Sequence, residues 1–247
     1  MILEERAYIK MKFSKRMDLF GESIFTTLAN MRSERKKQGL EVIDLSIGAP
    51  NIPPTQEVME TIAKEAMKPE NYLYAIKDSV DLQNTVKEWY ERRYGVVIDP
   101  TTELTSLLGS QDGLAHLALT LVDEGDTVLV QDPCYPIFRD GPLLAGAHVV
   151  TMPLLKENDY LIDFDRIDEK TAQDAKYMIV SYPNNPTCGV ANDEFYKKLI
   201  VFAKKYNIMI LHDNAYSELL FEGPGHSFLE FEGAKDVGIE FNSLSKT

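Results

Sequence analysis

This sequence of 247 residues has few cysteines, fewer basic than acidic residues and no long apolar run. Its two cysteines, Cys134 and Cys188, form no disulfide framework, which fits a protein of the reducing cytoplasm. Lys and Arg number 26 against 39 Asp and Glu, a net charge of −13, so the surface is expected to repel nucleic acid and anionic membranes. This balance does not identify a substrate, because a locally basic site can lie inside an acidic protein.

No stretch of about 18 apolar residues occurs, and the N-terminus mixes charges into every turn. The sequence therefore predicts neither a secretory signal nor a membrane span, and the cytoplasm is the expected location. Internal repeats, low-complexity segments and a long linker rich in Pro, Gly and Ser are also absent. A composition of 44% hydrophobic and 26% charged residues fits a globular protein of one large α/β domain, or of one domain and part of a second.

From about residue 95, short apolar runs alternate with longer amphipathic segments. The apolar runs, each a candidate strand, are Leu104–Leu108, Thr127–Gln131, His148–Met152, Tyr177–Ser181, Ile208–His212 and Val237–Phe241. The candidate helices between them are Asp112–Val122, Ile137–Ala145 and Asp193–Lys205. This alternation predicts βαβ units, and hence an α/β fold with a mainly parallel sheet flanked by helices. The preceding segment predicts a strand at Glu41–Ile47 and helices at Thr55–Met67 and Val80–Arg93.

Small, hydroxylic, aromatic and ionisable residues follow five of these candidate strands. The segments that they form are Gly109–Gly113, Asp132–Pro136, Tyr182–Thr187, Asp213–Tyr216 and Ser243–Lys246. In an open parallel sheet, ligands bind at the carboxyl ends of the strands. Five such segments at one edge of the sheet therefore predict a ligand site there.

Two of the segments suit a phosphate group. Gly109-Ser110-Gln111 opens a candidate helix, whose free N–H groups and dipole favour an anion, although an ordinary strand–helix turn can have the same sequence. In Ser243-Leu244-Ser245-Lys246, the serines can donate to the same phosphate while the lysine amine reacts with an aldehyde. A lysine becomes a good nucleophile at neutral pH only when its surroundings lower its pKa, and a lone lysine is otherwise a solvated surface group.

Asp213 follows an apolar run, so we expect it to be buried, and a buried carboxylate needs a partner. A pyridinium N–H would be such a partner, and a helix N-cap is the alternative role. Tyr216 and Asn185 can both reach the phenolic oxygen of a pyridine cofactor. Alternatively, Tyr216 anchors a helix to the core and an Asx-type turn forms around Asn184-Asn185. Tyr135 can stack on the cofactor ring or pack against the protein.

Taken in order, the five motifs resemble the signature of the fold-type I aminotransferases that depend on pyridoxal 5′-phosphate (PLP). They read Gly-Ser-Gln-Asp-Gly, Asp-Pro-Cys-Tyr-Pro, Tyr-Pro-Asn-Asn-Pro-Thr, His-Asp-Asn-Ala-Tyr and Ser-Leu-Ser-Lys. The branch resembled contains the aspartate, alanine and LL-diaminopimelate aminotransferases, and the resemblance begins near residue 15. It implies PLP as cofactor, transfer of an amino group between an amino acid and a 2-oxo acid, a seven-stranded mainly parallel sheet and a homodimer.

By this resemblance, Lys246 would bind PLP as a Schiff base and move the α-proton of the substrate. Asp213 would pair with the pyridine nitrogen, and Asn185 and Tyr216 would hold the phenolic oxygen. Tyr135 would stack on the ring. The residues expected to hold the phosphate are Ser110, Gln111, Ser243 and Ser245.

The resemblance also implies substrate contacts and a domain arrangement. Gly48 matches the glycine beside the substrate carboxylate, and Tyr74 matches the tyrosine given to the neighbouring subunit's site, with Tyr72 as the alternative. Residues 1–50 would form an N-terminal arm and a segment of a small α+β domain, and residues 51–247 the large PLP-binding domain. No metal site is expected.

The sequence departs from the family pattern in three places. Cys188 stands where a glycine usually follows Asn-Pro-Thr, so a positive φ there would be strained unless the turn shifts by one residue. Ser23 stands where the diaminopimelate enzymes carry a tyrosine. The family also continues well beyond this length, with arginines for the cofactor phosphate and for the substrate α-carboxylate. We therefore interpret the sequence as a fragment that holds PLP poorly and transaminates weakly.

Two other functions fit the same motifs. A carbon–sulfur β-lyase shares the fold and the cofactor, and differs in the group that leaves the substrate. A PLP-sensing or degenerate domain of a regulator is the non-enzymatic alternative. The sequence speaks against the regulator, because no basic DNA-binding module precedes the domain and the cofactor residues are present.

Overall fold

A computed structural model describes residues 12–46 and 48–246. The chain divides into two compact units, residues 1–48 and 49–247. The first unit contains the 3-10 helix η1 (Lys15–Leu19) and helix α1 (Ile24–Lys37). Helix α1 carries Arg35, Lys36 and Lys37 in its last turn, where the negative end of the helix dipole favours cations.

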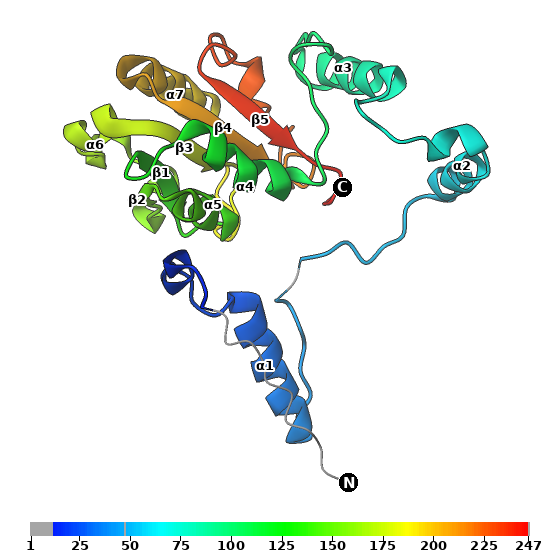
Figure 1. The fold of residues 1–247 in the computed structure, drawn as a ribbon, viewed down its shortest axis with the longest axis horizontal. Helices are drawn as coiled ribbons and strands as arrows, with labels where there is room; N and C mark the ends of the chain where they lie inside the picture. The colour runs from blue at the N-terminus through cyan, green and yellow to red at the C-terminus, as the bar shows by residue number, and fades with distance from the viewer. Residues whose placement is uncertain (1–11, 47, 247) are drawn as a thin grey trace. The chain divides into compact units, whose positions relative to one another are not determined.

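The second unit begins with helices, and from α4 onward helices alternate with strands along the chain (Figure 1). Its α-helices are α2 (Gln56–Ala66), α3 (Val80–Tyr94), α4 (Ser110–Leu121), α5 (Ile137–Ala145), α6 (Glu169–Asp174) and α7 (Asp193–Tyr206). Its strands are β1 (Thr127–Asp132), β2 (His148–Pro153), β3 (Ala175–Ser181), β4 (Met209–Asn214) and β5 (Gly238–Asn242). Its 3-10 helices are η2 (Pro69–Tyr72), η3 (Lys156–Asn158), η4 (Phe164–Arg166) and η5 (Phe228–Glu230). No helix within the described residues is long and apolar enough to cross a membrane.

The strands form one sheet in the order β2-β1-β3-β4-β5, and every neighbouring pair is parallel. The predicted α/β fold with a mainly parallel sheet is therefore confirmed. Since all the strands run in the same direction, their carboxyl ends lie at one edge of the sheet. Asp213 on β4 is in register with Phe241 on β5 at that edge.

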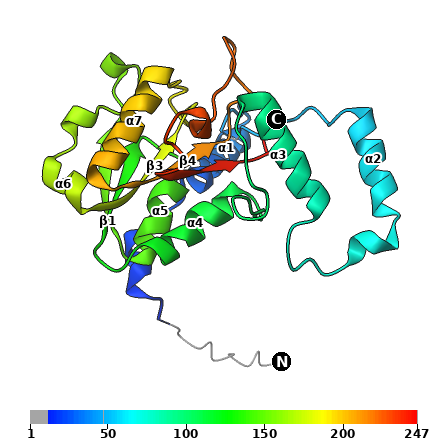
Figure 2. The ribbon, with the colours of Figure 1, turned by 90° about the horizontal axis from the view of Figure 1, so that it is seen from above.

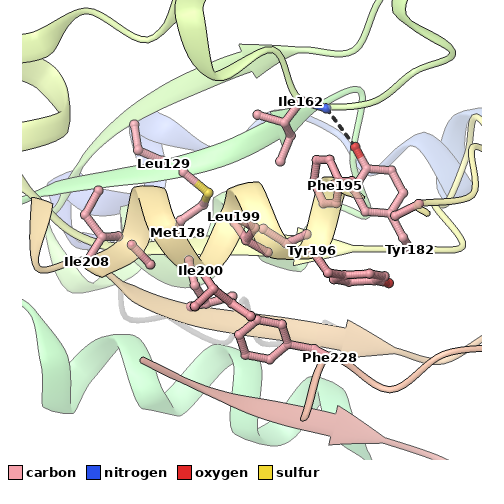
Figure 3. Close-up of a cluster of buried hydrophobic side chains, with 14 of the residues drawn as sticks. Leu129, Ile162, Met178, Tyr182, Phe195, Tyr196, Leu199, Ile200, Ile208 and Phe228 are labelled. Atoms are coloured by element: carbon pink, nitrogen blue, oxygen red, sulfur yellow. Dashed lines mark hydrogen bonds between the residues drawn. The ribbon is translucent and has the colours of Figure 1, made fainter. Parts of the chain in front are cut away.

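Both faces of the sheet are buried, because consecutive strand residues point to opposite faces. On one face, Met178 and Ile210 pack with side chains of α7, and Figure 3 shows this cluster. On the other face, Ile179 and Leu211 pack with side chains of α4 and α5. Figure 2 shows α4 and α5 on the side of the sheet opposite α7. The near-continuous apolar composition of the strands follows from this double burial.

Helix α3 is bounded by residues with clear capping roles and is tied to the sheet. The Ser79 hydroxyl accepts a hydrogen bond from the Leu82 N–H at its start, and Gly95 ends the helix in the left-handed conformation at φ 68°. Tyr90, on the buried side of the helix, donates to Glu240 of β5 at 2.9 Å. This bond links a helix early in the chain to the last strand.

Two predicted strands are wrong. Residues 104–108 form no strand; Leu108 is 96% exposed, and both the N–H and the hydroxyl of Ser106 bind the Asp78 carboxylate. Residues 41–46 form no strand either, and Ile47 lies outside the described residues. An apolar run becomes a strand only when a neighbouring strand takes its backbone hydrogen bonds, and the described part of the chain offers none to these two. The sheet within it consequently has five strands rather than seven.

Candidate active site

Four of the five predicted motifs follow a strand at the carboxyl edge of the sheet. They are Asp132–Pro136 after β1, Tyr182–Thr187 after β3, Asp213–Tyr216 at the end of β4 and Ser243–Lys246 after β5. The fifth, Gly109–Gly113, follows the segment that is not a strand. It nevertheless lies against the end of β5, because a Cβ on Gly113 would be 2.6 Å from the Phe241 ring. This close approach explains a glycine in the first turn of α4.

Asp213 is the buried carboxylate of this edge. It is 6% exposed, and its Oδ1 has no hydrogen-bond partner in the described part of the chain. Burial raises the pKa of Asp213 from 3.8 to about 6; nearby His212 lowers this pKa and Glu240 raises it. Residues 215–218 form a bend and a turn, so the N-cap alternative is excluded. A buried acceptor without a partner suits a ligand that brings a hydrogen-bond donor.

Asn185 and Tyr216 are brought together from different loops. The Asn185 side-chain amide donates to the Tyr216 hydroxyl at 3.3 Å. Burial raises the pKa of Tyr216, and the charge of Asp213 is the next largest cause. The neighbouring Asn184 takes the turn-forming role, since its Oδ1 accepts from the N–H and the hydroxyl of Thr187 at 3.2 and 2.8 Å. The Asx-type turn therefore belongs to Asn184, and contact of Asn185 with a cofactor stays a prediction.

Tyr135 joins the same edge to the start of α4. Its hydroxyl donates to Gln111 Oε1 at 2.7 Å, and its ring packs edge-on against Phe138 with the centroids 6.1 Å apart. Burial raises the pKa of Tyr135, followed by the charge of Asp213. Tyr135 can therefore pack against the protein and still belong to the candidate site.

Helix α4 begins two residues earlier than the sequence suggests, at Ser110 rather than Asp112. Gly109 precedes it at φ 90°, a conformation that glycine adopts without steric cost. Ser110 and Gln111 are thus the first two residues of the helix, where backbone N–H groups have no intrahelical partner. The earlier start gives both predicted phosphate ligands the N–H geometry that an anion prefers.

The segment after β5 brings two hydroxyls together. Ser243 Oγ donates to Ser245 Oγ at 2.8 Å, and the Ser245 N–H donates to Ser243 Oγ at 3.1 Å. Lys246 follows directly and is half-buried. The two serines can therefore act on one ligand next to the amine.

The residues predicted to contact the substrate are exposed. Gly48 is the last residue of the first unit and is exposed. Tyr74 is 92% exposed, and Tyr72 is 72% exposed and donates its hydroxyl to the Ala66 carbonyl at 2.6 Å. Contact of Gly48 and Tyr74 with a substrate stays a prediction.

Space for a ligand is present beside Asn185 and Tyr216. A cavity of about 630 Å³ adjoins them, with Cys188, Leu219 and Phe221 also in its wall. Within residues 12–46 and 48–246, His, Cys, Asp and Glu form no group that could hold a metal ion. The residues that could hold a small molecule here are those of the motifs.

Cys188 has a positive φ of 61°. Its N–H donates to the Asn184 carbonyl at 2.9 Å, which closes the loop in this conformation. The left-handed region is costly for a residue with a Cβ, whereas glycine enters it freely. The predicted strain at Cys188 is therefore present, because the turn does not shift and this residue itself has the positive φ.

Replacing Cys188 with glycine is expected to raise the free energy of unfolding by about 1 kcal/mol, because the strain is removed. Urea denaturation would measure the gain. Cys188→Ala is the matched control, since it removes the thiol and keeps the Cβ, and it should give no such gain. Equal stability of the two variants would show that φ at this position is not the cause.

A buried contact between a histidine and a glutamate was not predicted from the sequence. His212 Nδ1 lies 3.1 Å from Glu240 Oε2, and both side chains are 0% exposed. The two residues are register partners on neighbouring strands β4 and β5. The sequence did contain a sign of this contact, because each of two apolar runs includes one ionisable residue. The two residues occupy positions that face the same side of the sheet.

The family model for aminotransferase class I and II matches residues 41–247. The chain belongs to this family. A similar relative is the LL-diaminopimelate aminotransferase of Aquifex aeolicus, 44% identical over 239 residues, which are 96% of this chain and 62% of the relative. The LL-diaminopimelate aminotransferase of Dehalococcoides mccartyi strain 195 is 42% identical with the same coverage.

Solved structures share the fold. Substrate-bound BacF from Bacillus subtilis superposes with a TM-score of 0.88 at 35% identity, over 96% of this chain and 61% of that one. A probable N-succinyldiaminopimelate aminotransferase from Thermus thermophilus gives 0.85 at 33% identity, over 90% and 60%. The chain thus spans about three-fifths of the length of its relatives in this aminotransferase family.

Proposed function

We propose that the protein is a PLP-dependent aminotransferase that moves an amino group between an amino acid and a 2-oxo acid. The observation that carries the proposal is Asp213 Oδ1, a buried carboxylate oxygen without a partner in the described residues, at the edge where the motif residues meet. A protonated pyridine nitrogen supplies the donor that this oxygen lacks. Membership of the aminotransferase class I and II family supports the same reaction.

The remaining residues fit the other parts of PLP. Asn185 and Tyr216, 3.3 Å apart, are both able to donate to the phenolic oxygen. Tyr135 offers an aromatic ring that is held in place through Gln111. The groups for the phosphate are the first-turn N–H groups and side chains of Ser110 and Gln111, and the hydroxyls of Ser243 and Ser245.

When bound, PLP supplies an aldehyde that combines with amines and a ring that withdraws electrons from the substrate. Asp213 would hold a proton on the ring nitrogen, because an ionised carboxylate favours the pyridinium form. Asn185 and Tyr216 would orient the ring through its phenolic oxygen. Lys246 would hold the cofactor through its amine and, once the amine of the substrate has displaced it, would take the proton from the α-carbon as a general base.

We base the proposed substrate on the named relatives. Because the enzymes at 42–44% identity are named LL-diaminopimelate aminotransferases, we propose LL-diaminopimelate as the first amino donor to test. Gly48 and Tyr74 are the proposed substrate contacts, the latter in the site of a second subunit of a homodimer. Residues 1–50 would contribute an arm and part of a small domain, and the enzyme would work in the cytoplasm.

The test is reduction with borohydride in the presence of PLP, followed by mass mapping of the peptides. A pyridoxyl group is expected on Lys246 and should be absent from Lys246→Ala. Lys235→Ala is the matched control, since Lys235 is an exposed lysine bound to Glu103 and its loss should leave the adduct intact. Equal labelling of many lysines, with circular dichroism showing a folded protein, would refute the proposed cofactor site.

A further inference from the structure

Glu240 lies at the centre of a buried polar cluster behind the candidate site. Its Oε1 accepts from the Tyr90 and Ser227 hydroxyls, both at 2.9 Å. Its Oε2 accepts from the Phe228 N–H at 2.8 Å and lies 3.1 Å from His212 Nδ1. Four elements, namely α3, η5, β4 and β5, thus converge on one carboxylate that is 0% exposed.

This hydrogen-bond pattern favours an ionised Glu240. A carboxylate can accept four hydrogen bonds, and the Phe228 N–H can only donate. His212 Nδ1 must then carry a proton, since it faces an acceptor. A buried carboxylate also needs a compensating charge, and among the described residues the side chain in contact with it that can carry a positive charge is His212. The other ring nitrogen, Nε2, lies 3.4 Å from the Tyr196 hydroxyl, which accepts from it when the ring is an imidazolium.

His212 and Asp213 are consecutive residues of β4, so their side chains point to opposite faces of the sheet. His212 faces α7 through Tyr196, whereas Asp213 is in register with Phe241, which packs with α4. Both side chains are buried, so water screens their interaction little. A charge on His212 therefore acts on Asp213 through the strand.

Other titratable groups surround these two residues. Tyr135 and Tyr216 lie near Asp213 on the ligand side. Those near Tyr90, Tyr196 and Glu240 on the other side of the sheet are Tyr94, Tyr182, Glu218 and Glu230. The neighbouring tyrosines are neutral at physiological pH, because burial raises the pKa of Tyr94 to about 12 and that of Tyr196 still further. Of the two charged groups that act on Asp213, His212 favours the ionised carboxylate and Glu240 disfavours it.

We infer that His212 is a positioning residue which, as an imidazolium paired with Glu240, holds Asp213 in the ionised form that a protonated pyridine nitrogen requires. The inference rests on the proposed function, because it assigns His212 a role toward the PLP ring. The Glu240 carboxylate, 3.1 Å from His212 Nδ1, places a negative charge beside the imidazole. The imidazolium then opposes the effect of burial on Asp213 from the far side of the sheet, and it outweighs the smaller opposing effect of the Glu240 charge.

The test compares the 15N chemical shift of ring-labelled PLP bound to the wild-type chain, to His212→Gln and to Tyr90→Phe. In His212→Gln the ring signal should move from the pyridinium toward the pyridine value, and PLP affinity should fall about tenfold, the equivalent of one pKa unit. Tyr90→Phe removes one hydrogen bond from Glu240 and leaves the charges unchanged, so its ring signal should match the wild type. An unchanged signal in His212→Gln with PLP bound would overturn the inference.

Measurements on the cofactor-free chain separate this inference from the proposed function. Imidazole 15N shifts of His212 should show an imidazolium at pH 7.5, and a neutral ring would overturn the inference even if no variant folds. The midpoint of Asp213 titration, followed by carboxyl 13C shifts, should be higher in His212→Gln than in the wild type. If the wild type shows both properties but binds no PLP, the proposed function fails and the electrostatic role of His212 stands.

Discussion

Asp213→Asn is expected to stabilise the cofactor-free protein at neutral pH while weakening its binding of PLP. The pKa of Asp213 rises from 3.8 to about 6 on folding because the carboxylate loses its hydration. The folded state therefore binds this proton more tightly than the unfolded state. Above pH 6 the carboxylate is ionised in both states, and Asp213 then destabilises the folded state by the full amount. This destabilisation is lost as the pH falls from 6 toward 3.8.

The difference of about 2 pKa units corresponds to about 3 kcal/mol of destabilisation at pH 7.5. Asparagine has no charge to bury, although its amide also needs hydrogen bonds, so a net gain of about 1–2 kcal/mol is expected. Urea denaturation at pH 7.5 and pH 5 would show this gain at the higher pH and a smaller one at the lower.

PLP binding should change in the opposite direction. Loss of a hydrogen bond between charged groups should weaken binding about 10- to 100-fold, as measured by equilibrium titration. Asp132→Asn is the matched control, because Asp132 ends a strand at the same edge and is exposed. Asp132→Asn should change neither the free energy of unfolding nor the affinity for PLP by much. An Asp213→Asn protein that binds PLP as tightly as the wild type would contradict the role assigned to this carboxylate.

Gly238→Ala is expected to lower the free energy of unfolding by about 2–3 kcal/mol, because the first residue of β5 has no room for a methyl group. A Cβ there would lie 2.6 Å from the Ile210 carbonyl oxygen and 2.8 Å from the Phe228 ring. The carbonyl belongs to a central strand and cannot rotate away. The strand must therefore shift, and β5 carries Glu240 and leads into Ser243.

The consequence for the site is measurable in the same variant. Thermal denaturation should show the loss of stability, and the yield of pyridoxyl adduct on Lys246 should fall with it. Gly21→Ala is the control, because a Cβ at Gly21 meets no atom within 4 Å. It should leave stability unchanged or slightly higher, since alanine restricts the unfolded chain. If the two alanine variants are equally stable, the close packing around Gly238 is not as described.

The strands that could be predicted are those with buried neighbours. The candidate strands Tyr177–Ser181 and Ile208–His212 agree with β3 and β4 to within two residues at each end. Their apolar runs are long enough to be buried on both faces, and the parallel neighbours are supplied by the same chain. Leu104–Leu108 has an equally apolar pattern but no strand to pair with in the described residues, and a local pattern cannot reveal that difference.

The residues at the candidate site were predictable because their types carry chemistry at strand ends. Asp213 was expected to be buried, and it is 6% exposed. The roles of neighbouring asparagines were not separable, since Asn184 and Asn185 have the same side chain and differ only in what the fold places beside them. The pair of His212 and Glu240 was missed for the same reason, because the two residues lie 28 positions apart and meet only through strand pairing.

By itself, the sequence determined the alternation of strands and helices, the edge at which the polar motifs gather and the family resemblance of those motifs. These properties depend on periodicity and on the order of residues, which are local. Only the tertiary structure decided which apolar runs become strands, which buried carboxylate oxygen has no partner among the described residues and which histidine lies behind it. Those outcomes depend on hydrogen-bond partners and burial supplied by distant segments, and no local pattern contains them.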